Sequence, residues 1–327
     1  MAEVADIQFT PRRGLRGGHL QTIAGNFLPR RNGLPNGEDR AFSVEDEAQV
    51  VCRCHWQPDR QKRLTVIIVH GLEGSVESQY VIGTGTKAWE AGMNVVRMNM
   101  RNCGGTEALT PTLYHSGLSA DVGAVAKTLI EQDSLQRVAL VGYSMGGNLV
   151  LKLAGDWGGE APRQLRAVAA VSPAMDLAES ADAMHTPANW VYEQRFLINL
   201  RRRVGYKAKL FPGRYDLARL RGVRSIREFD EKVTAHYCGF TGADDYYYRA
   251  SSARVLERIA VPTLVLHALD DPFIRVTADT RAKLSANPNI RYIETAHGGH
   301  CAFLAEPNGY DGRWAERTAI EFFRELS

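Results

Sequence analysis

The sequence GYSMG at positions 142–146 is the pattern in this chain that could most readily carry out chemistry. It follows the apolar run VALV and precedes GNLVLKLAG, whose apolar spacing is that of a helix. A G-x-S-x-G sequence between a strand and a helix forms a sharp turn that holds the serine hydroxyl above the end of the strand. Glycines are needed there because strand and helix come too close for larger side chains. We therefore predict that Ser144 is a nucleophile.

A serine hydroxyl is a weak nucleophile and needs a base that is itself held by an acid. When the serine lies on such a turn, the acid and then the histidine follow it along the chain. The stretch TLVLHALDDPF supplies two acids directly after an apolar run. We favour Asp271 as the acid because it directly precedes Pro272 in a tight turn after a strand. We expect Asp270 to bond the loop or to face solvent.

The stretch YIETAHGGHCAF supplies two candidate bases after the next apolar run. We favour His300 over His297 because the two glycines between them let the later residue swing back over the edge of the sheet. We expect His297 to be a loop histidine that pairs with backbone groups.

Attack by the serine on a carbonyl carbon creates an oxyanion, which two backbone N–H groups must stabilise. We predict that Met145, directly after the nucleophile, supplies one of them. Leu72 in the loop HGLEGS is expected to supply the other, since Gly71 lets the chain turn so that the Leu72 N–H points at the site. We expect His70 to brace this loop rather than to react.

Six short apolar runs recur along the chain, most of them separated by stretches of helical length. Most of the runs are continuous and rich in β-branched residues, which is typical of strands covered on both faces of a parallel sheet. This alternation predicts an α/β fold with a mostly parallel sheet flanked by helices, whose strand ends bring the candidate residues together. The runs are 64–69, 93–100, 138–141, 167–171, 263–267 and 290–293.

The connection from Ser172 to Pro262 is far longer than the dozen or so residues that a parallel crossover needs. Its sequence is mostly helical in pattern, in the segments NWVYEQRFLINLRRRV, DLARLRGV and ADDYYYRASSARVLERI. We predict a core formed by residues 1–172 and 262–327 and a helical cap or lid formed by residues 173–261. Such insertions commonly shape a substrate pocket.

The composition excludes several classes of protein. Hydrophobic residues make up 44% of the 327 residues and charged residues 24%, which argues against disordered and collagen-like chains. The net charge of +3 and the absence of a recognisable module argue against a nucleic-acid partner. No P-loop, dinucleotide fingerprint or spaced ligand cluster occurs, so we expect no cofactor and no metal. Without a membrane-length apolar run or a leader at the start, we expect a cytoplasmic protein.

Nine short motifs, in order and with matching spacing, give the chain a specific resemblance to the YheT-like family of α/β-hydrolases, also called the AB hydrolase 4 family. The resemblance extends from about residue 11 to the C-terminus. The motifs are HLQT (19–22), HGLEGS (70–75), MRNCGGT (100–106), LYHSG (113–117), GYSMGGN (142–148), SIREFDE (225–231), DDYYYRAS (244–251), HALDDPF (267–273) and HGGHCAF (297–303).

The resemblance implies an α/β-hydrolase fold and a charge-relay triad of Ser144, Asp271 and His300. It also implies hydrolysis of small or lipid-like carboxylic esters, since related eukaryotic members are described as acting on acylglycerols, phospholipids or acetyl esters. Those members have membrane anchors that we do not find in this sequence. Asn102 stands where relatives often carry glycine, and Arg101 beside it is expected to brace its loop. The same triad could instead cleave amides or thioesters, or the protein could be a homologue that binds a ligand without catalysis.

The predicted cap is strongly basic. From Arg195 to Arg227 there are nine Arg and two Lys against the single acid Asp216, a net charge of +10. The remainder of the chain therefore sums to −7. Either these charges pair with acids of the core, or the cap makes a weak contact with an anionic surface such as anionic lipid. The sequence makes no prediction of the oligomeric state.

Overall fold

The computed structural model describes residues 9–326, and eight strands form a single sheet within it. The strands are β1 (Glu38–Glu45), β2 (Ala48–His55), β3 (Thr65–Val69), β4 (Asn94–Met98), β5 (Val138–Tyr143), β6 (Leu165–Val171), β7 (Thr263–Ala268) and β8 (Ile290–Thr295). They lie in the order β1-β2-β4-β3-β5-β6-β7-β8. β2 pairs antiparallel with both β1 and β4, whereas β3 to β8 are joined by parallel pairs. The prediction of a mostly parallel α/β sheet is confirmed.

The central strands are apolar because both of their faces are covered. Every residue of β3, β4, β5 and β7 is buried, so these strands have no solvent face and need no alternation of polar and apolar residues. In contrast, β1 at the edge consists of exposed and half-buried positions with one buried residue, Phe42. The six apolar runs of the sequence correspond to β3 to β8.

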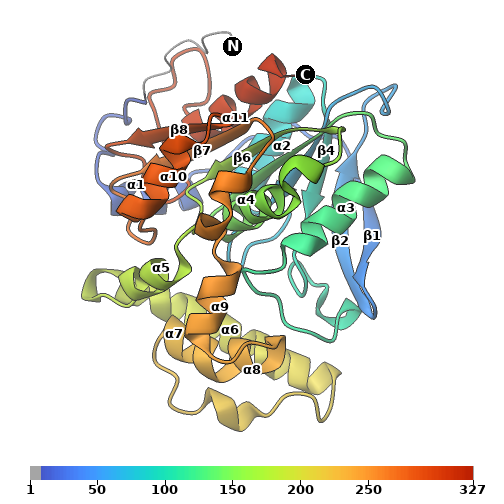
Figure 1. Ribbon diagram of the computed structural model, residues 1–327. Coiled ribbons are helices and arrows are strands. Elements are labelled where there is room, and N and C mark those ends of the chain that lie inside the picture. Colours follow the sequence, from blue (N-terminus) through green and yellow to red (C-terminus); the bar gives the residue numbers. More distant parts are fainter. Residues whose placement is uncertain (1–8, 327) are drawn as a thin grey trace.

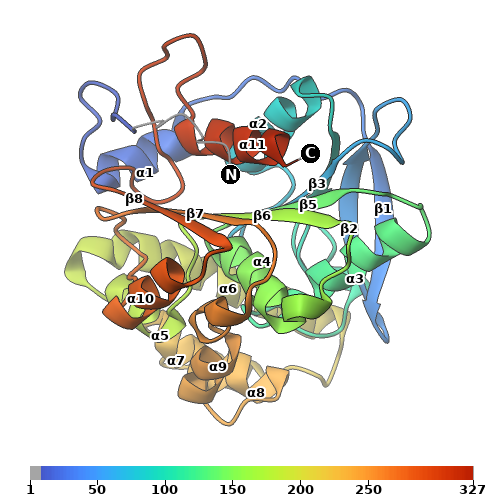
Figure 2. The ribbon, with the colours of Figure 1, turned by 45° about the horizontal axis from the view of Figure 1, so that its top comes forward.

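Helices cover the two faces of the sheet (Figure 1). Figure 2 shows α2 and α11 on one face and α3, α4 and α10 on the other. α11 buries an apolar side against the strands with Trp314, Ala319 and Phe323. The bounds are α1 (Gly18–Phe27), α2 (Gln79–Glu90), α3 (Ser119–Glu131), α4 (Met145–Trp157), α10 (Ala278–Ala286) and α11 (Trp314–Glu325).

The long connection between β6 and β7 contains five helices, which gather beyond one edge of the sheet in Figures 1 and 2. They are α5 (Leu177–Met184), α6 (Trp190–Leu210), α7 (Ile226–Phe229), α8 (Ala235–Cys238) and α9 (Ala243–Ala250), with a π-helical turn at Asp230–Thr234. α6, α7 and the π-helical turn share a small apolar cluster of their own, which includes Leu197, Phe229 and Val233. We call residues 173–261 the cap segment. The division into core and cap stays a prediction.

The helix expected across ADDYYYRASSARVLERI is shorter than its pattern indicates. It ends at Ala250 and is followed by two 3-10 turns. The cause is a tertiary contact with Asn148 of α4. Its side-chain amide donates to the Ala250 carbonyl at 2.9 Å, and its oxygen accepts from the Ser252 N–H at 2.8 Å. The two backbone groups are therefore hydrogen-bonded to a side chain of α4, and they are not available to extend α9.

Within residues 9–326, the helices are all too short or too polar to cross a bilayer. The expectation that the chain starts without a leader falls partly on residues 1–8, which lie outside the described residues.

Candidate active site

Ser144 lies at the junction of β5 and α4 in a backbone conformation that residues other than glycine rarely adopt, with φ 54° and ψ −117°. A Cβ at Gly142 would lie 2.1 Å from the Gly146 carbonyl oxygen, and a Cβ at Gly146 would lie 2.4 Å from two backbone oxygens of the β3 end. The Ser144 N–H donates to the Val171 carbonyl at 2.9 Å. Both glycines are therefore sterically required, and the turn fixes the serine at the carboxyl edge of the sheet.

Asp271 and His300 meet at the same edge. His300 Nδ1 lies 2.8 Å from Asp271 Oδ2, and the Asp271 side chain is fully buried. The other carboxylate oxygen accepts from the N–H groups of Phe273 and Ile274, at 2.8 and 3.1 Å. Since both oxygens are held, the carboxylate has one fixed orientation and fixes the histidine ring.

The electrostatics of this pair favour the charged acid and a basic histidine. Burial alone raises the pKa of Asp271, but the charge and hydrogen bond of His300 outweigh it and lower that pKa below its usual range. Burial is the largest single effect and lowers the pKa of His300, but the charge and hydrogen bond of Asp271, together with Cys301, outweigh it and raise that pKa well above the usual histidine value. His300 is therefore more basic than a free histidine.

The two alternative candidates, Asp270 and His297, form a second pair that does not line the cavities at Ser144. Asp270 Oδ2 lies 3.2 Å from His297 Nδ1, and Asp270 Oδ1 accepts from the Gly299 N–H at 2.9 Å. Thus Asp270 does bond the loop, whereas His297 pairs with a side chain and not with backbone. Among the described residues, the lining of the cavities at Ser144 includes His300 but neither Asp270 nor His297.

The loop after β3 runs directly against the serine. A Cβ at Gly71 would lie 3.1 Å from the Ser144 Cβ, and Leu72 lines the cavity beside it. Met145 begins α4, so its N–H is one of the first four helical donors, which have no partner within the helix. Both expected oxyanion donors thus belong to residues at the cavity.

His70 holds this loop to the next one. Its Nδ1 lies 2.7 Å from the Gly71 carbonyl oxygen and its Nε2 accepts from the Met100 N–H at 3.1 Å. Burial lowers the pKa of His70 to about 4, so the ring is neutral and has no nitrogen left for catalysis. The contacts fit a bracing role.

Glu73, also in the HGLEGS loop, was not singled out from the sequence. It has a φ of 57° and accepts hydrogen bonds from the Tyr114 hydroxyl at 2.6 Å and from Arg203 at 2.9 and 3.0 Å. Arg203 belongs to α6, so the cap segment forms an ion pair with Glu73, the residue next to Leu72. The motifs HGLEGS and LYHSG contain Glu73 and Tyr114, but only the fold brings them together.

α1 supports the histidine loop, which sequence reasoning also missed. Thr22 Oγ1 accepts from the His300 N–H at 2.8 Å. The buried Gln21 side chain donates to the Leu304 carbonyl at 3.1 Å and accepts from the Leu304 N–H at 2.7 Å. The motif HLQT, at the opposite end of the chain, was the available signal.

Arg101 and Asn102 lie in the loop after β4. Arg101 donates two hydrogen bonds of 2.6 Å to the buried carboxylate of Asp121 and a third, of 2.7 Å, to Glu45. Asn102 has a φ of 63°, in the left-handed region that glycine adopts most readily. Arg101 thus makes the contacts expected of a brace.

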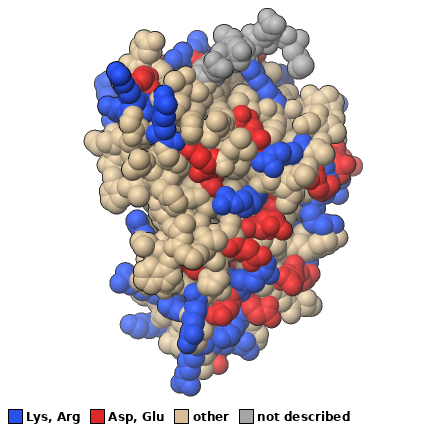
Figure 3. Space-filling model, turned by 90° about the vertical axis from the view of Figure 1, so that its left-hand side faces the viewer, with Lys and Arg blue, Asp and Glu red and all other residues tan. Residues whose placement is uncertain are grey.

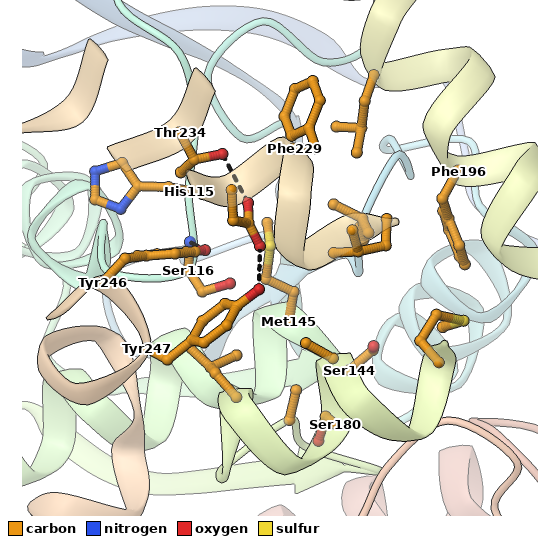
Figure 4. A pocket seen from close by; sticks show the side chains of 18 of the residues that line it. His115, Ser116, Ser144, Met145, Ser180, Phe196, Phe229, Thr234, Tyr246 and Tyr247 are labelled. Carbon is orange, nitrogen blue, oxygen red and sulfur yellow. Dashed lines mark hydrogen bonds between the residues drawn. The ribbon is translucent and has the colours of Figure 1, made fainter. Parts of the chain in front are cut away.

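A cavity of about 140 Å³ lies between the strand ends and the cap segment (Figure 4). An ordered water occupies roughly 10–15 Å³ on this scale, so the cavity can hold a small organic group. Most of its lining is apolar, with Met145, Phe196 and Phe229 among its side chains. A second cavity, with Ile23 and Phe27 of α1 in its lining, meets the first at Ser144 and His300. Two limbs of the site therefore extend from the serine.

No group of three or more His, Cys, Asp or Glu side chains within residues 9–326 has the arrangement of a metal site.

Comparisons with known proteins give the family. The model of the alpha/beta hydrolase fold family matches residues 65–307. YheT of Escherichia coli (strain K12), named as a candidate esterase, is 34% identical over 94% of this chain and 91% of its own length. Phospholipase ABHD3 of Mus musculus is 31% identical over 75% of this chain, and the match spans 60% of ABHD3.

Solved structures show the same fold at low identity. The 2,6-dihydroxy-pseudo-oxynicotine hydrolase matches with a TM-score of 0.60 at 18% identity, over 94% of this chain and 72% of its own. Est1E from Butyrivibrio proteoclasticus matches with a TM-score of 0.56 at 16% identity, over 89% and 98%. The relatives named for esterase and phospholipase activity support a hydrolase. The chain belongs to the α/β-hydrolase family and, within it, to the YheT-like proteins whose motifs it carries.

Proposed function

We propose that this protein is a serine hydrolase that cleaves carboxylic esters through an acyl-enzyme. The observation that carries the proposal is the contact of 2.8 Å between Asp271 and His300 at a cavity that His300 shares with Ser144. The strained turn under Ser144 supports its role as nucleophile. The relatives named for esterase and phospholipase activity favour an ester as the bond that is cleaved.

In the proposed reaction, Ser144 Oγ attacks the carbonyl carbon while His300 Nε2 takes the hydroxyl proton. The carbonyl electron pair moves to oxygen, which accepts hydrogen bonds from the N–H groups of Leu72 and Met145. The intermediate then collapses, and His300 passes its proton to the departing alcohol. Asp271 keeps the Nδ1 proton in place and stabilises the imidazolium. Water repeats the sequence on the acyl-enzyme and releases the acid.

The two apolar limbs of the site favour a small or lipid-like ester as substrate. We also propose a reducing compartment, the cytoplasm, because all five cysteines are free thiols.

A weak contact with anionic surfaces is a further part of the proposal. Lys and Arg side chains gather at the lower end of the face in Figure 3, which the cap segment occupies. Of the eleven basic residues from Arg195 to Arg227, only Arg203 and Arg227 form ion pairs with acids in the described part of the chain. The others are left to interact with solvent, backbone carbonyls or an anionic partner.

The proposal is tested by trapping the nucleophile with a fluorophosphonate probe and locating the label by peptide mass. We expect the label on Ser144, and none on the Ser144→Ala protein, whose turnover of an ester should fall on the order of 10⁶-fold. Ser180→Ala is the matched control, because Ser180 lines the same cavity away from the turn. Substantial ester turnover by folded Ser144→Ala protein would falsify the assignment.

Rates on matched oxygen esters, thioesters and amides then separate the three kinds of bond. A folded protein that binds these compounds but neither cleaves them nor takes the probe would be a ligand-binding homologue.

A further inference from the structure

The cavity at Ser144 has a polar region away from the serine, which the proposed reaction does not use. Its lining there includes His115, Asp230, Thr234, Tyr246 and Tyr247. In Figure 4, Ser144 lies on the opposite side of the cavity from Thr234 and Tyr246. These side chains come from three sequence motifs, LYHSG, SIREFDE and DDYYYRAS, and from the π-helical turn. Motifs from three separate segments thus converge on one polar site.

Asp230 is the centre of this polar region. Dashed lines in Figure 4 mark the hydrogen bonds that its carboxylate accepts from Thr234 Oγ1, at 2.7 Å, and from the Tyr247 hydroxyl, at 2.8 Å. A carboxylate has about four lone-pair sites, so each oxygen keeps acceptor capacity. Asp230 forms no ion pair with any residue in the described range 9–326. The charge of Arg227 favours the ionised form of Asp230 without touching it, and a carboxylate at an apolar cavity is costly unless further donors reach it.

The charge state and the local backbone support a binding role. Burial raises the pKa of Asp230 to about 6, while Thr234 and Tyr247 oppose this effect, so the group is mostly ionised at neutral pH. Asp230 and Thr234 are the first and last residues of the π-helical turn. Such turns interrupt regular helices at functional sites more often than elsewhere.

A neutral donor accompanies this acceptor. His115 Nδ1 accepts from the Gly117 N–H at 3.1 Å, so the proton of the neutral ring lies on Nε2. Burial lowers the pKa of His115 to about 3, which keeps the ring uncharged. The region therefore combines a charged acceptor with a neutral ring, so it holds no second charge that would compete for the carboxylate.

We propose that this polar region binds a hydroxyl group of the substrate, carried on the part of the ester that extends from Ser144 under the cap segment. The inference rests on the proposed ester hydrolysis. A hydroxyl fits because it can donate to Asp230 and brings no charge of its own into a largely apolar cavity. An ammonium group fits less well, since Arg203 lines the same cavity and the cap segment around it is strongly basic.

The test compares matched esters that differ only in a terminal hydroxyl. One series carries it on the acyl chain, as p-nitrophenyl esters from butanoate to octanoate, and the other on the alcohol chain, as acetates of linear diols and of the simple alcohols. In one series we expect the hydroxylated ester to have a kcat/KM at least about tenfold higher than its partner, as befits a hydrogen bond to a charged group. Ratios near one in both series would overturn the proposal.

Variants separate recognition from a structural role. In Asp230→Asn the ratio of the hydroxylated to the unsubstituted ester should fall towards one. A merely structural Asp230 would instead lower both rates together and leave the ratio unchanged. Glu228→Gln is the matched control, because it removes a carboxylate from the exposed side of the same helical stretch, and its ratio should equal that of the natural protein.

Binding to the Ser144→Ala protein, measured by calorimetry with the same esters, distinguishes failure of this inference from failure of the proposed function. Tighter binding of the hydroxylated ester supports the polar site even if ester cleavage is not the reaction. Equal binding of the pair, or tighter binding of a matched ester with a terminal ammonium measured beside them, would refute it.

Discussion

At the scale of single residues, two adjacent carboxylates have different surroundings and should have different effects. Asp271→Asn should lower kcat about 10⁴-fold, because the amide no longer holds the His300 tautomer that accepts the serine proton. Asp270→Asn should change kcat less than about tenfold, since Asp270 bonds Gly299 and His297 outside the cavity. Steady-state kinetics on a soluble ester, with circular dichroism as a check on folding, measures both.

The same contrast should separate the two histidines. His300→Ala is expected to remove turnover almost entirely, whereas His297→Ala should retain most of it. If Asp270→Asn lowered kcat more than Asp271→Asn, Asp270 would be the acid. If His297→Ala lowered kcat more than His300→Ala, His297 would be the base.

The pKa of His300 predicts how activity depends on pH. His300 must be neutral to act as base, and Asp271 raises its pKa, so the acidic limb of kcat/KM should lie above the ordinary histidine value of about 6.5. In Asp271→Asn the largest raising effect is gone, while burial still lowers the pKa of the ring and Cys301 opposes burial only in part. The limb of its residual activity should therefore move to lower pH. An unchanged limb would mean that another group controls it.

At the scale of secondary-structure elements, α6 and the loop after β3 are coupled through Arg203 and Glu73. Both side chains are largely buried, with exposed fractions of 12% and 7%. Losing one partner of a buried ion pair leaves the other without compensation. Glu73→Gln should lower kcat roughly 10- to 100-fold with a smaller change in KM, because Leu72 next to it would no longer hold its N–H at the oxyanion.

Glu107→Gln is the matched control for this prediction. Glu107 also pairs with Arg203, at 3.4 Å, but lies outside the loop that carries Leu72. Kinetics and thermal unfolding of the two variants should show similar stability losses and a loss of kcat in Glu73→Gln alone. Equal kcat values for the Glu73→Gln and Glu107→Gln proteins would mean that the contact between Arg203 and Glu73 has only a structural role.

At the scale of the whole molecule, the charge asymmetry predicts a preference for anionic surfaces. The protein should bind anionic phospholipid vesicles more tightly than neutral ones, and salt should weaken the binding as it screens the charges. Replacing Arg202, Arg214 and Arg221 by Ala should weaken that binding at least tenfold, since all three are exposed and lie in the basic part of the cap segment. Vesicle sedimentation over a range of ionic strength measures the effect.

Three exposed cations of the core, Lys62, Arg63 and Arg163, provide the charge-matched control for vesicle binding. Their replacement by Ala should leave the preference largely intact. Equal affinity for neutral and anionic vesicles at low salt would contradict the proposal and leave the cap charges simply solvated.

Those features of the protein that depend on local pattern can be predicted from the order of its residues. Continuous apolar runs identify buried parallel strands because such strands have no solvent face. The glycines of the G-x-S-x-G sequence predict the strained turn at Ser144, since no larger residue fits at Gly142 or Gly146 against the neighbouring backbone. The chain order of serine, acid and histidine then narrowed the remaining candidates to two neighbouring pairs.

Contacts between segments that are remote in the chain become visible in the folded molecule alone. Three hydrogen bonds illustrate this, because each joins residues separated in the chain. They link Arg203 to Glu73, the His300 N–H to Thr22, and Tyr247 to Asp230. A remote contact also ends α9 at Ala250, because the Asn148 side chain hydrogen-bonds the Ala250 carbonyl and the Ser252 N–H. Local sequence carries no information on which distant donor will reach an acceptor, since packing of the whole chain sets those distances.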